Sequence, residues 1–128
     1  MARWSAACTI PPVRRTVLVI DDHPGFRGTA RRLLEGDGFE VVGEAGDAAT
    51  GVAAARMLEP DIALVDIYLP DSDGFDLTSR LTALARPPAV ILTSSREEVE
   101  FERLVERSSA RGFVPKHELS GDALEDLL

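Results

Sequence analysis

Apolar and polar positions along the chain follow two rhythms, one typical of strands and the other of helices. Five short apolar runs, each bounded by polar, glycine or proline residues, have the character of buried strands. They lie at 17–20, 39–44, 62–65, 89–92 and 112–114.

After each of these runs, apolar residues recur every three or four positions, which is the spacing of an amphipathic helix. The predicted helices lie at about 24–35, 47–58, 75–85, 97–107 and 120–128. Strand and helix therefore alternate five times. This alternation predicts a parallel sheet with helices on both faces.

Individual residues mark the ends and inner faces of the helices. Pro24 is tolerated in a first helical turn, Asp47 is a predicted N-cap, and Pro60 follows the end of the second helix. In the first helix, the residues predicted to lie on the inner face are Phe26, Ala30, Leu33 and Leu34.

The fourth predicted helix has one apolar face and one charged face. We expect Val99, Leu104, Val105 and part of Phe101 to face the core. The other face is almost all charge. Its simplest interpretation is a solvated surface, and its functional interpretation is a surface that binds a partner.

Length, charge and cysteine content narrow the class of protein. The 128 residues suffice for one domain with a real core; we assign it to 14–128 and expect 1–13 to be a poorly ordered N-terminal extension. The net charge of −8 argues against a nucleic-acid surface. No apolar run approaches the roughly 20 residues that cross a membrane. A single Cys8 without a signal sequence predicts a cytoplasmic location.

Carboxylates follow two of the apolar runs. Asp21 and Asp22 come directly after 17–20, and Asp66 comes directly after 62–65. Ligands of open parallel sheets bind beyond the carboxyl ends of the strands. On adjacent strands, about 5 Å apart, the three side chains would form one acidic cup. An isolated Asp66 would more often be a helix cap or a solvated loop residue, so the set is more informative than its members.

Two further residues converge on the same edge, Thr93 after the fourth run and Lys116 after the fifth. Crowded carboxylates repel one another, and a divalent cation relieves this repulsion. Oxygen ligands with few protein contacts favour Mg²⁺. A phosphoryl group would complete the site, because metal, Lys116 and Thr93 could share its oxygens as phosphoryl transfer requires.

In order and spacing these residues resemble the receiver domain of a bacterial two-component response regulator, over about 14–128. The matching residues are Asp21, Asp22, Asp66, Pro70, Gly74, Thr93, Phe113 and Lys116. Segments 21–24 and 112–119 are similar to receivers that carry a LuxR-type helix-turn-helix output. The resemblance implies a flavodoxin-like, doubly wound α/β fold with five parallel strands in the order 2-1-3-4-5.

The resemblance also implies a signalling switch that is not an enzyme, although it promotes its own phosphorylation and dephosphorylation. Asp66 would accept a phosphoryl group from a sensor histidine kinase. Asp22, Asp66 and the backbone carbonyl of Tyr68 would bind Mg²⁺ directly, and Asp21 would act mainly through water.

Other residues would transmit the signal or set its lifetime. Thr93, Lys116 and Phe113 would bind phosphate and change the partner surface. Tyr68 and Ser95 flank the approach of water to the phosphoryl group and would tune dephosphorylation. The Tyr68 ring either covers the phosphoryl group or points outward without affecting the rate.

The output is not in this chain. Because the final helix ends abruptly on two leucines, we favour an excised receiver over a natural stand-alone one. The full protein would regulate transcription, and the receiver could form a homodimer on phosphorylation. We expect this segment to bind neither nucleic acid nor membrane.

Some features leave alternatives open. His117 follows Lys116 where many receivers have proline, which leaves the isomer of that peptide bond open. His23 and His117 are interpreted as loop or capping residues. A receiver-like module that works without phosphate remains an alternative function. A Mg²⁺-dependent phosphohydrolase is a weaker one, since the sequence after Asp66 lacks the second aspartate of such enzymes.

Overall fold

The computed structural model describes residues 14–96 and 98–128; the predicted extension at 1–13 lies outside them. Five parallel strands form one sheet in the order β2-β1-β3-β4-β5. The strands are β1 (Thr16–Ile20), β2 (Glu40–Ala45), β3 (Ile62–Asp66), β4 (Ala89–Ser94) and β5 (Gly112–Pro115). The predicted fold class and strand order are confirmed.

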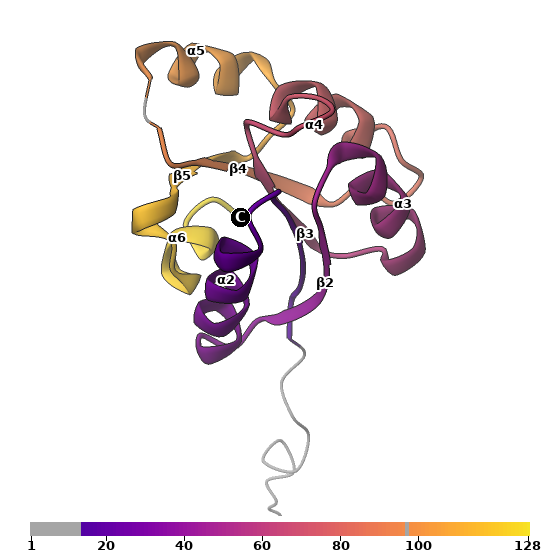
Figure 1. Ribbon diagram of the computed structural model, residues 1–128, viewed down its shortest axis with the longest axis vertical. Helices are drawn as coiled ribbons and strands as arrows, with labels where there is room; N and C mark the ends of the chain where they lie inside the picture. The colour runs from indigo at the N-terminus through magenta and orange to yellow at the C-terminus, as the bar shows by residue number, and fades with distance from the viewer. Residues whose placement is uncertain (1–13, 97) are drawn as a thin grey trace, which may run out of the picture.

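Helices cover both faces of the sheet (Figure 1). On one face lie α2 (Pro24–Gly36) and α6 (Gly121–Glu125). On the other lie α3 (Ala48–Leu58), α4 (Gly74–Thr82) and α5 (Val99–Arg107). A short 3₁₀ helix, η1 (Lys116–Glu118), follows β5. Within the described ranges no helix is both long and apolar enough to span a membrane.

The core forms on both sides of the interior strands, of which β1 and the central β3 are examples. Val17 and Val19 pack toward α2 and α6, whereas Leu18 and Ile20 pack toward α3 and α4. All four side chains are fully buried. Each such side chain stabilises the fold by about 1.5–3 kcal/mol relative to an exposed one. Burial on both faces explains why these strands read as unbroken apolar runs.

The helix ends follow local chemistry. The Asp47 carboxylate accepts a hydrogen bond from the Thr50 N–H at 2.8 Å, which confirms the predicted cap of α3. Helix α4 ends at Thr82, earlier than the predicted residue 85. Its last turn tightens, with the Leu84 N–H donating to the Leu81 carbonyl, as the chain approaches Pro87.

Some predicted inner-face positions are wrong. In α2, Ala30 and Leu34 are four residues apart and share the buried face, whereas Leu33 lies beside it and is 42% exposed. In α5, Val99 is 95% exposed and Leu104 is 40% exposed.

The predictions for Phe101 and Val105 are confirmed: α5 buries Phe101, with Val105 partly buried beside it. The Phe101 ring packs against Phe113 of β5, with ring centroids 5.6 Å apart. This contact orients α5 about its axis. Periodicity within the helix did not reveal it because the partner ring lies on another element.

Candidate functional site

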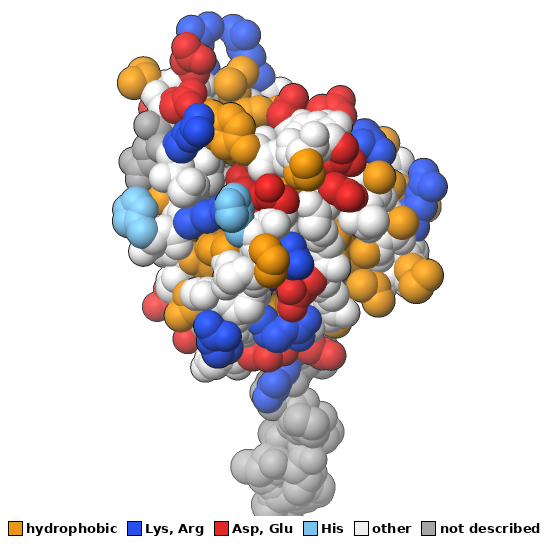
Figure 2. Space-filling view, viewed as in Figure 1, with side chains coloured by type: hydrophobic (Ala, Val, Ile, Leu, Met, Phe, Trp, Pro, Cys, Tyr) orange, Lys and Arg blue, Asp and Glu red, His pale blue; other side chains and the backbone are white. Residues whose placement is uncertain are grey.

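Strand pairing brings the predicted carboxylates together. Ile20 pairs with Val65 across β1 and β3, so the next residues, Asp21 and Asp66, meet at the carboxyl edge of the sheet. Carboxylate oxygens of Asp21, Asp22 and Asp66 lie within 4.8 Å of one another. Figure 2 shows acidic side chains gathered near the centre of the face of the molecule that is in view, beside a histidine. The acidic cup predicted from the sequence is therefore present.

Lys116 supplies positive charge to the cup. Its ammonium nitrogen lies 2.7 Å from Asp21 Oδ2 and 3.2 Å from Asp66 Oδ2. The contact with Asp21 is an ion pair but not a hydrogen bond, because its angles fall outside hydrogen-bond geometry. The same nitrogen lies 4.4 Å from the centroid of the Phe26 ring, a cation–π contact. Lys116 reaches the cup because η1 follows the edge strand β5 directly.

Thr93 stands beside Asp66. The two residues are register partners on the adjacent strands β3 and β4, so their side chains project on the same face of the sheet. Thr93 is 1% exposed, and its hydroxyl has no hydrogen-bond partner among the described residues. Leaving a buried hydroxyl unpaired costs about 1–3 kcal/mol. The cup thus contains a polar group without a partner in the protein.

The environment of Asp66 raises the pKa of its carboxyl above the usual 3.8. Burial is the main cause, and the negative charge of Asp21 adds to it. A hydrogen bond from the Tyr68 N–H at 3.1 Å and the charge of Lys116 act in the opposite direction. The ionised form of Asp66 is therefore short of compensating positive charge.

The loop after Asp66 is held by close backbone packing. The Gly74 N–H donates to the Ile67 carbonyl at 2.8 Å. A Cβ at Gly74 would lie 2.8 Å from both the Asp66 carbonyl oxygen and Ile67 Cα. Only glycine fits there, so Gly74 sets the path of the chain directly after Asp66.

A second anchor of this loop was missed in the sequence. The Asp71 carboxylate accepts hydrogen bonds from the Ala48 and Ala49 N–H groups, at 2.8 and 3.1 Å. These bonds, the first above all, lower the pKa of Asp71. Asp71 therefore ties the loop to the first turn of α3. The bonds join residues more than 20 positions apart, and periodicity gives no signal for them.

Tyr68 reaches away from its own loop toward α5. Its hydroxyl donates to Glu98 Oε1 at 2.7 Å, and its ring lies 4.9 Å from the Arg96 guanidinium carbon and 6.2 Å from the Phe101 ring. The residue remains 42% exposed. Ser95 is exposed after the end of β4. The two residues thus lie on neighbouring loops beside the cup.

The histidines and the last loop complete the surroundings. His23 Nδ1 lies 3.0 Å from Asp22 Oδ1 and 3.3 Å from Asp21 Oδ1. His23 stands at the N-cap of α2, but its side chain makes no capping hydrogen bond. His117 lies 3.3 Å from Glu118 Oε2. Every described peptide bond is trans, including the one between Lys116 and His117.

The predicted site residues thus form three groups, of which Tyr68 and Ser95, on the loops beside the cup, are one. Asp21, Asp22, Asp66, Thr93 and Lys116 meet at the carboxyl edge of the sheet. Phe113 lies apart from them, packed against Phe101 under α5.

A doubly wound parallel sheet of this order, with acidic residues gathered at its carboxyl edge, defines a flavodoxin-like α/β protein. Residues 17–127 match the model of the response regulator receiver domain. The chain belongs to this family.

Known relatives agree with this assignment. The transcription regulator BvgA of Bordetella pertussis is 40% identical over 102 residues, which cover 80% of this chain and 49% of BvgA. The chain therefore spans about half the length of this relative.

Solved structures agree as well. The receiver domain of the response regulator NarL from Mycobacterium tuberculosis superposes with a TM-score of 0.81 at 30% identity, covering 91% of this chain and 98% of that one. A LuxR-family response regulator from Aurantimonas sp. SI85-9A1 gives 0.78 at 27% identity, with coverages of 89% and 81%. These relatives are consistent with the predicted LuxR-type subgroup.

Proposed function

We propose that this receiver domain is a phosphorylation-dependent switch in which Asp66 accepts a phosphoryl group from a sensor histidine kinase. The observation that carries the proposal is the buried Thr93 hydroxyl, which has no partner in the described protein although it stands beside Asp66. Buried polar groups are almost always hydrogen-bonded. An acceptor oxygen of a phosphoryl group on Asp66 would satisfy this hydroxyl.

The charges of the cup favour a divalent cation as the cofactor. Asp21, Asp22 and Asp66 carry three negative charges when ionised, and Lys116 balances one of them. Hard carboxylate oxygens are the ligands that Mg²⁺ prefers. Asp22, Asp66 and the backbone carbonyl of Tyr68 would hold the ion directly, and Asp21 would act through water. When bound, Mg²⁺ would neutralise charge on the oxygens of the transferring phosphoryl group.

The residues of the chain account for the remaining chemistry. An Asp66 carboxylate oxygen forms the new bond to phosphorus while the bond from phosphorus to the donor histidine nitrogen breaks. The Lys116 ammonium, already within 3.2 Å of Asp66, pairs with the negative charge that arrives. The Tyr68 N–H bond to Asp66 Oδ1 and the Lys116 bond to Oδ2 together orient the carboxylate.

The signal would leave the cup through Thr93 and Phe113. Bonding of the Thr93 hydroxyl to the phosphoryl group would draw the end of β4 inward and let the Phe113 ring follow. The resulting change is a population shift, limited by how differently phosphate binds the two states. The partner surface made by α5 and β5 would change with it.

The wider role is part of the same proposal. BvgA is described by its name as a transcription regulator, so we propose that the receiver controls transcription through an output domain outside this chain. A homodimer formed on phosphorylation is one route for that control. We also propose a cytoplasmic location, which rests on the single Cys8, and an N-terminal extension at 1–13.

Incubation with acetyl phosphate and Mg²⁺, followed by intact-mass measurement, tests the proposal. We expect one phosphoryl group on the parent chain and none on Asp66→Asn. Asp76→Asn, which removes an exposed carboxylate of α4, is the matched control and should label normally.

The alternatives predict different results. Undiminished labelling of Asp66→Asn would contradict Asp66 as the acceptor. A folded parent chain that takes no label from acetyl phosphate or from a kinase would favour the phosphate-independent module. Release of phosphate from a phosphate monoester over many turnovers would favour the phosphohydrolase, because self-dephosphorylation alone lets a receiver turn over acetyl phosphate.

A further inference from the structure

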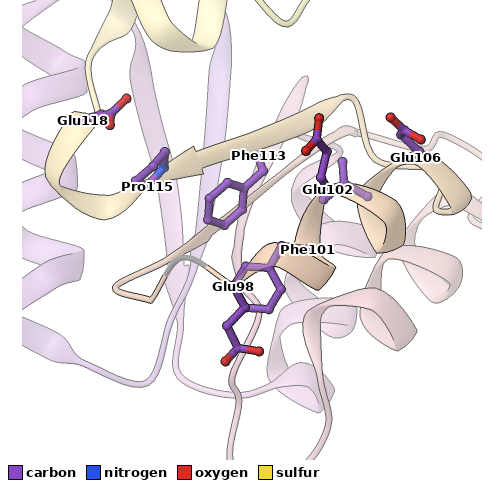
Figure 3. Close-up of a pocket in the computed structure, with 8 residues that line it drawn as sticks. Glu98, Phe101, Glu102, Glu106, Phe113, Pro115 and Glu118 are labelled. Atoms are coloured by element: carbon purple, nitrogen blue, oxygen red, sulfur yellow. The ribbon is translucent and has the colours of Figure 1, made fainter.

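A groove of about 470 Å³ lies between α5 and β5, outside the acidic cup. Its floor is apolar and consists of Phe101, Val105, Phe113 and Pro115. Figure 3 shows the Phe101 and Phe113 rings facing each other between the two elements. We call this feature the acidic groove because of its rim.

Four glutamates form the rim: Glu98, Glu102, Glu106 and Glu118. Glu102 and Glu106 are four residues apart on one stripe of α5, about 6 Å along the helix axis. Glu98 is the N-cap of the same helix. Glu118 lies on η1, beyond the end of β5 (Figure 3). The rim therefore presents carboxylates on both sides of an apolar floor.

Two of these carboxylates have no polar partner in the described part of the protein. Glu98 accepts the Tyr68 hydroxyl, and Glu118 pairs with His117. Glu102 and Glu106 make neither an ion pair nor a side-chain hydrogen bond within 14–96 and 98–128. Like charges four residues apart destabilise a helix.

The arginines of α5 do not relieve this repulsion. Arg103 and Arg107 line a separate hollow with Glu100 and Leu104. The helix thus separates its charges, with the acidic stripe beside the apolar floor. Glu102 lies in the first turn of α5, where the helix dipole favours a carboxylate, but Glu106 lies near the C-terminal end and lacks this compensation. The acidic stripe therefore suits a partner that supplies cations.

The form of the partner follows from the strand beside the groove. β5 is an edge strand of four residues that ends at Pro115, which has no N–H to donate. A short edge strand ending in proline is a poor template for an added strand. A helix laid along α5 can instead place cations at the same four-residue spacing as the rim.

A second copy of the chain fits the groove poorly. A symmetric contact centred on the groove would bring its four rim glutamates close to those of the other copy, and like charges placed close together oppose association. The net charge of −8 adds to that repulsion.

We propose that the acidic groove binds a basic amphipathic helix of a partner protein, with Arg or Lys four residues apart and leucine-type side chains on the adjoining stripe. The cations pair with Glu102, Glu106 and Glu118, and the apolar side chains cover Phe113 and Val105. Because Phe113 forms part of the floor, binding would depend on phosphorylation at Asp66; this dependence alone rests on the proposed function.

A synthetic probe tests the groove directly. The probe is a fluorescein-labelled helical peptide with three arginines spaced by four residues and leucines on the next stripe, titrated against the full chain by fluorescence anisotropy. An exposed ion pair changes affinity by about 1.4- to 5-fold, so the double variant Glu102→Gln/Glu106→Gln should weaken binding about tenfold. The double variant Glu40→Gln/Glu100→Gln, which removes the same charge outside the groove, should change it less than about twofold.

Amide chemical-shift mapping locates the probe. We expect the largest changes at Phe101, Val105 and Phe113, and weaker binding as salt is raised. A peptide with glutamates in place of the arginines should not bind.

Three results would overturn the proposal: equal weakening by both double variants, shift changes centred elsewhere, or binding of the glutamate peptide. Dimerisation of the parent that Glu102→Gln/Glu106→Gln alters, measured by sedimentation, would assign the groove to a second copy instead. The titration uses the unphosphorylated chain. A negative binding result would therefore overturn the groove proposal without bearing on whether Asp66 accepts a phosphoryl group.

Discussion

At the scale of single residues, burial and charge act against each other at Asp66. Burial and the charge of Asp21 raise the pKa of its carboxyl above 3.8, in spite of Lys116. The folded protein therefore binds a proton at Asp66 more tightly than the unfolded chain does. Stability contributed by this group is fully present below about pH 3.8 and is lost as the pH rises through the folded pKa.

We predict from this that Asp66→Asn stabilises the domain at neutral pH without Mg²⁺. The amide has the shape of the protonated acid, keeps the acceptor for the Tyr68 N–H, and is neutral at every pH. The free energy of unfolding should rise by about 1 kcal/mol, the usual size of a single-residue effect. The gain should shrink as the pH falls toward 3.8.

Urea unfolding in a chelator, at about pH 7.5 and at about pH 4, measures this difference. Asp76→Asn serves as the control, because Asp76 is exposed on α4. A less stable Asp66→Asn at neutral pH would mean that the contacts with Lys116 and the Tyr68 N–H outweigh burial.

Tyr68 bears on the lifetime of the signal. Its ring is tethered through the hydroxyl to Glu98 and lies beside Arg96, next to the cup. We predict that the ring limits the approach of water and that Ser95 is too short to position a water molecule. Tyr68→Asn should then speed self-dephosphorylation about tenfold, equivalent to about 1.4 kcal/mol in the barrier.

Decay of the phosphorylated chain in Mg²⁺ after removal of the donor measures the rate. Tyr68→Phe keeps the ring and loses only the bond to Glu98, so it should remain within about twofold of the parent. If Tyr68→Asn decays at the parent rate, the ring does not shield the phosphoryl group.

At the scale of elements, the connection from β3 to α4 decides how Asp66 is presented. Gly74 begins α4 and packs directly on the backbone of Asp66 and Ile67. We predict that Gly74→Ala lowers the free energy of unfolding by about 1–3 kcal/mol, because its Cβ would displace backbone rather than a flexible side chain. Labelling at Asp66 should also slow, since the loop after it must shift.

Chemical denaturation and acetyl phosphate labelling test the two parts of this prediction. Gly36→Ala is the matched control: a Cβ at Gly36 meets no atom within 4 Å. Its stability should change by less than about 1 kcal/mol. Equal effects of the two substitutions would argue against close packing at Gly74.

At the scale of the whole molecule, aromatic contacts connect the cup with the acidic groove. The Phe101 ring centroid lies 6.2 Å from that of Tyr68 and 5.6 Å from that of Phe113. Thr93 pairs in register with Val114, the neighbour of Phe113. A change at the carboxyl edge therefore has a packed route to the surface made by α5 and β5.

We predict that Thr93→Ala still accepts a phosphoryl group but transmits it weakly. Without the hydroxyl, phosphate no longer draws β4 toward Asp66, and amide chemical-shift changes at Phe101 and Phe113 should fall to less than about half of those in the parent. Thr82→Ala, which removes a hydroxyl bonded within α4, is the control. Parent-like changes in Thr93→Ala would place the coupling on another route.

The sequence alone predicted the sheet, its strand order and the convergence of Asp21, Asp22, Asp66, Thr93 and Lys116. These features could be predicted because strands buried on both faces appear in the sequence as unbroken apolar runs. The residue that follows such a run lies at the carboxyl end of the strand, where ligands of parallel sheets bind. The strand order came from resemblance in motif order and spacing. The roles of these residues stay predictions.

Only the tertiary structure decided which face of α5 is buried, where Tyr68 reaches, and that the Thr93 hydroxyl lacks a partner. Each depends on how separate elements pack. Phe101 packs against Phe113, and the Tyr68 hydroxyl bonds Glu98, which is 30 positions away in the sequence. Thr93 is buried beside Asp66 on the neighbouring strand. Periodicity reports which residues of one element share a face, but the packing of neighbouring elements selects the face that is buried.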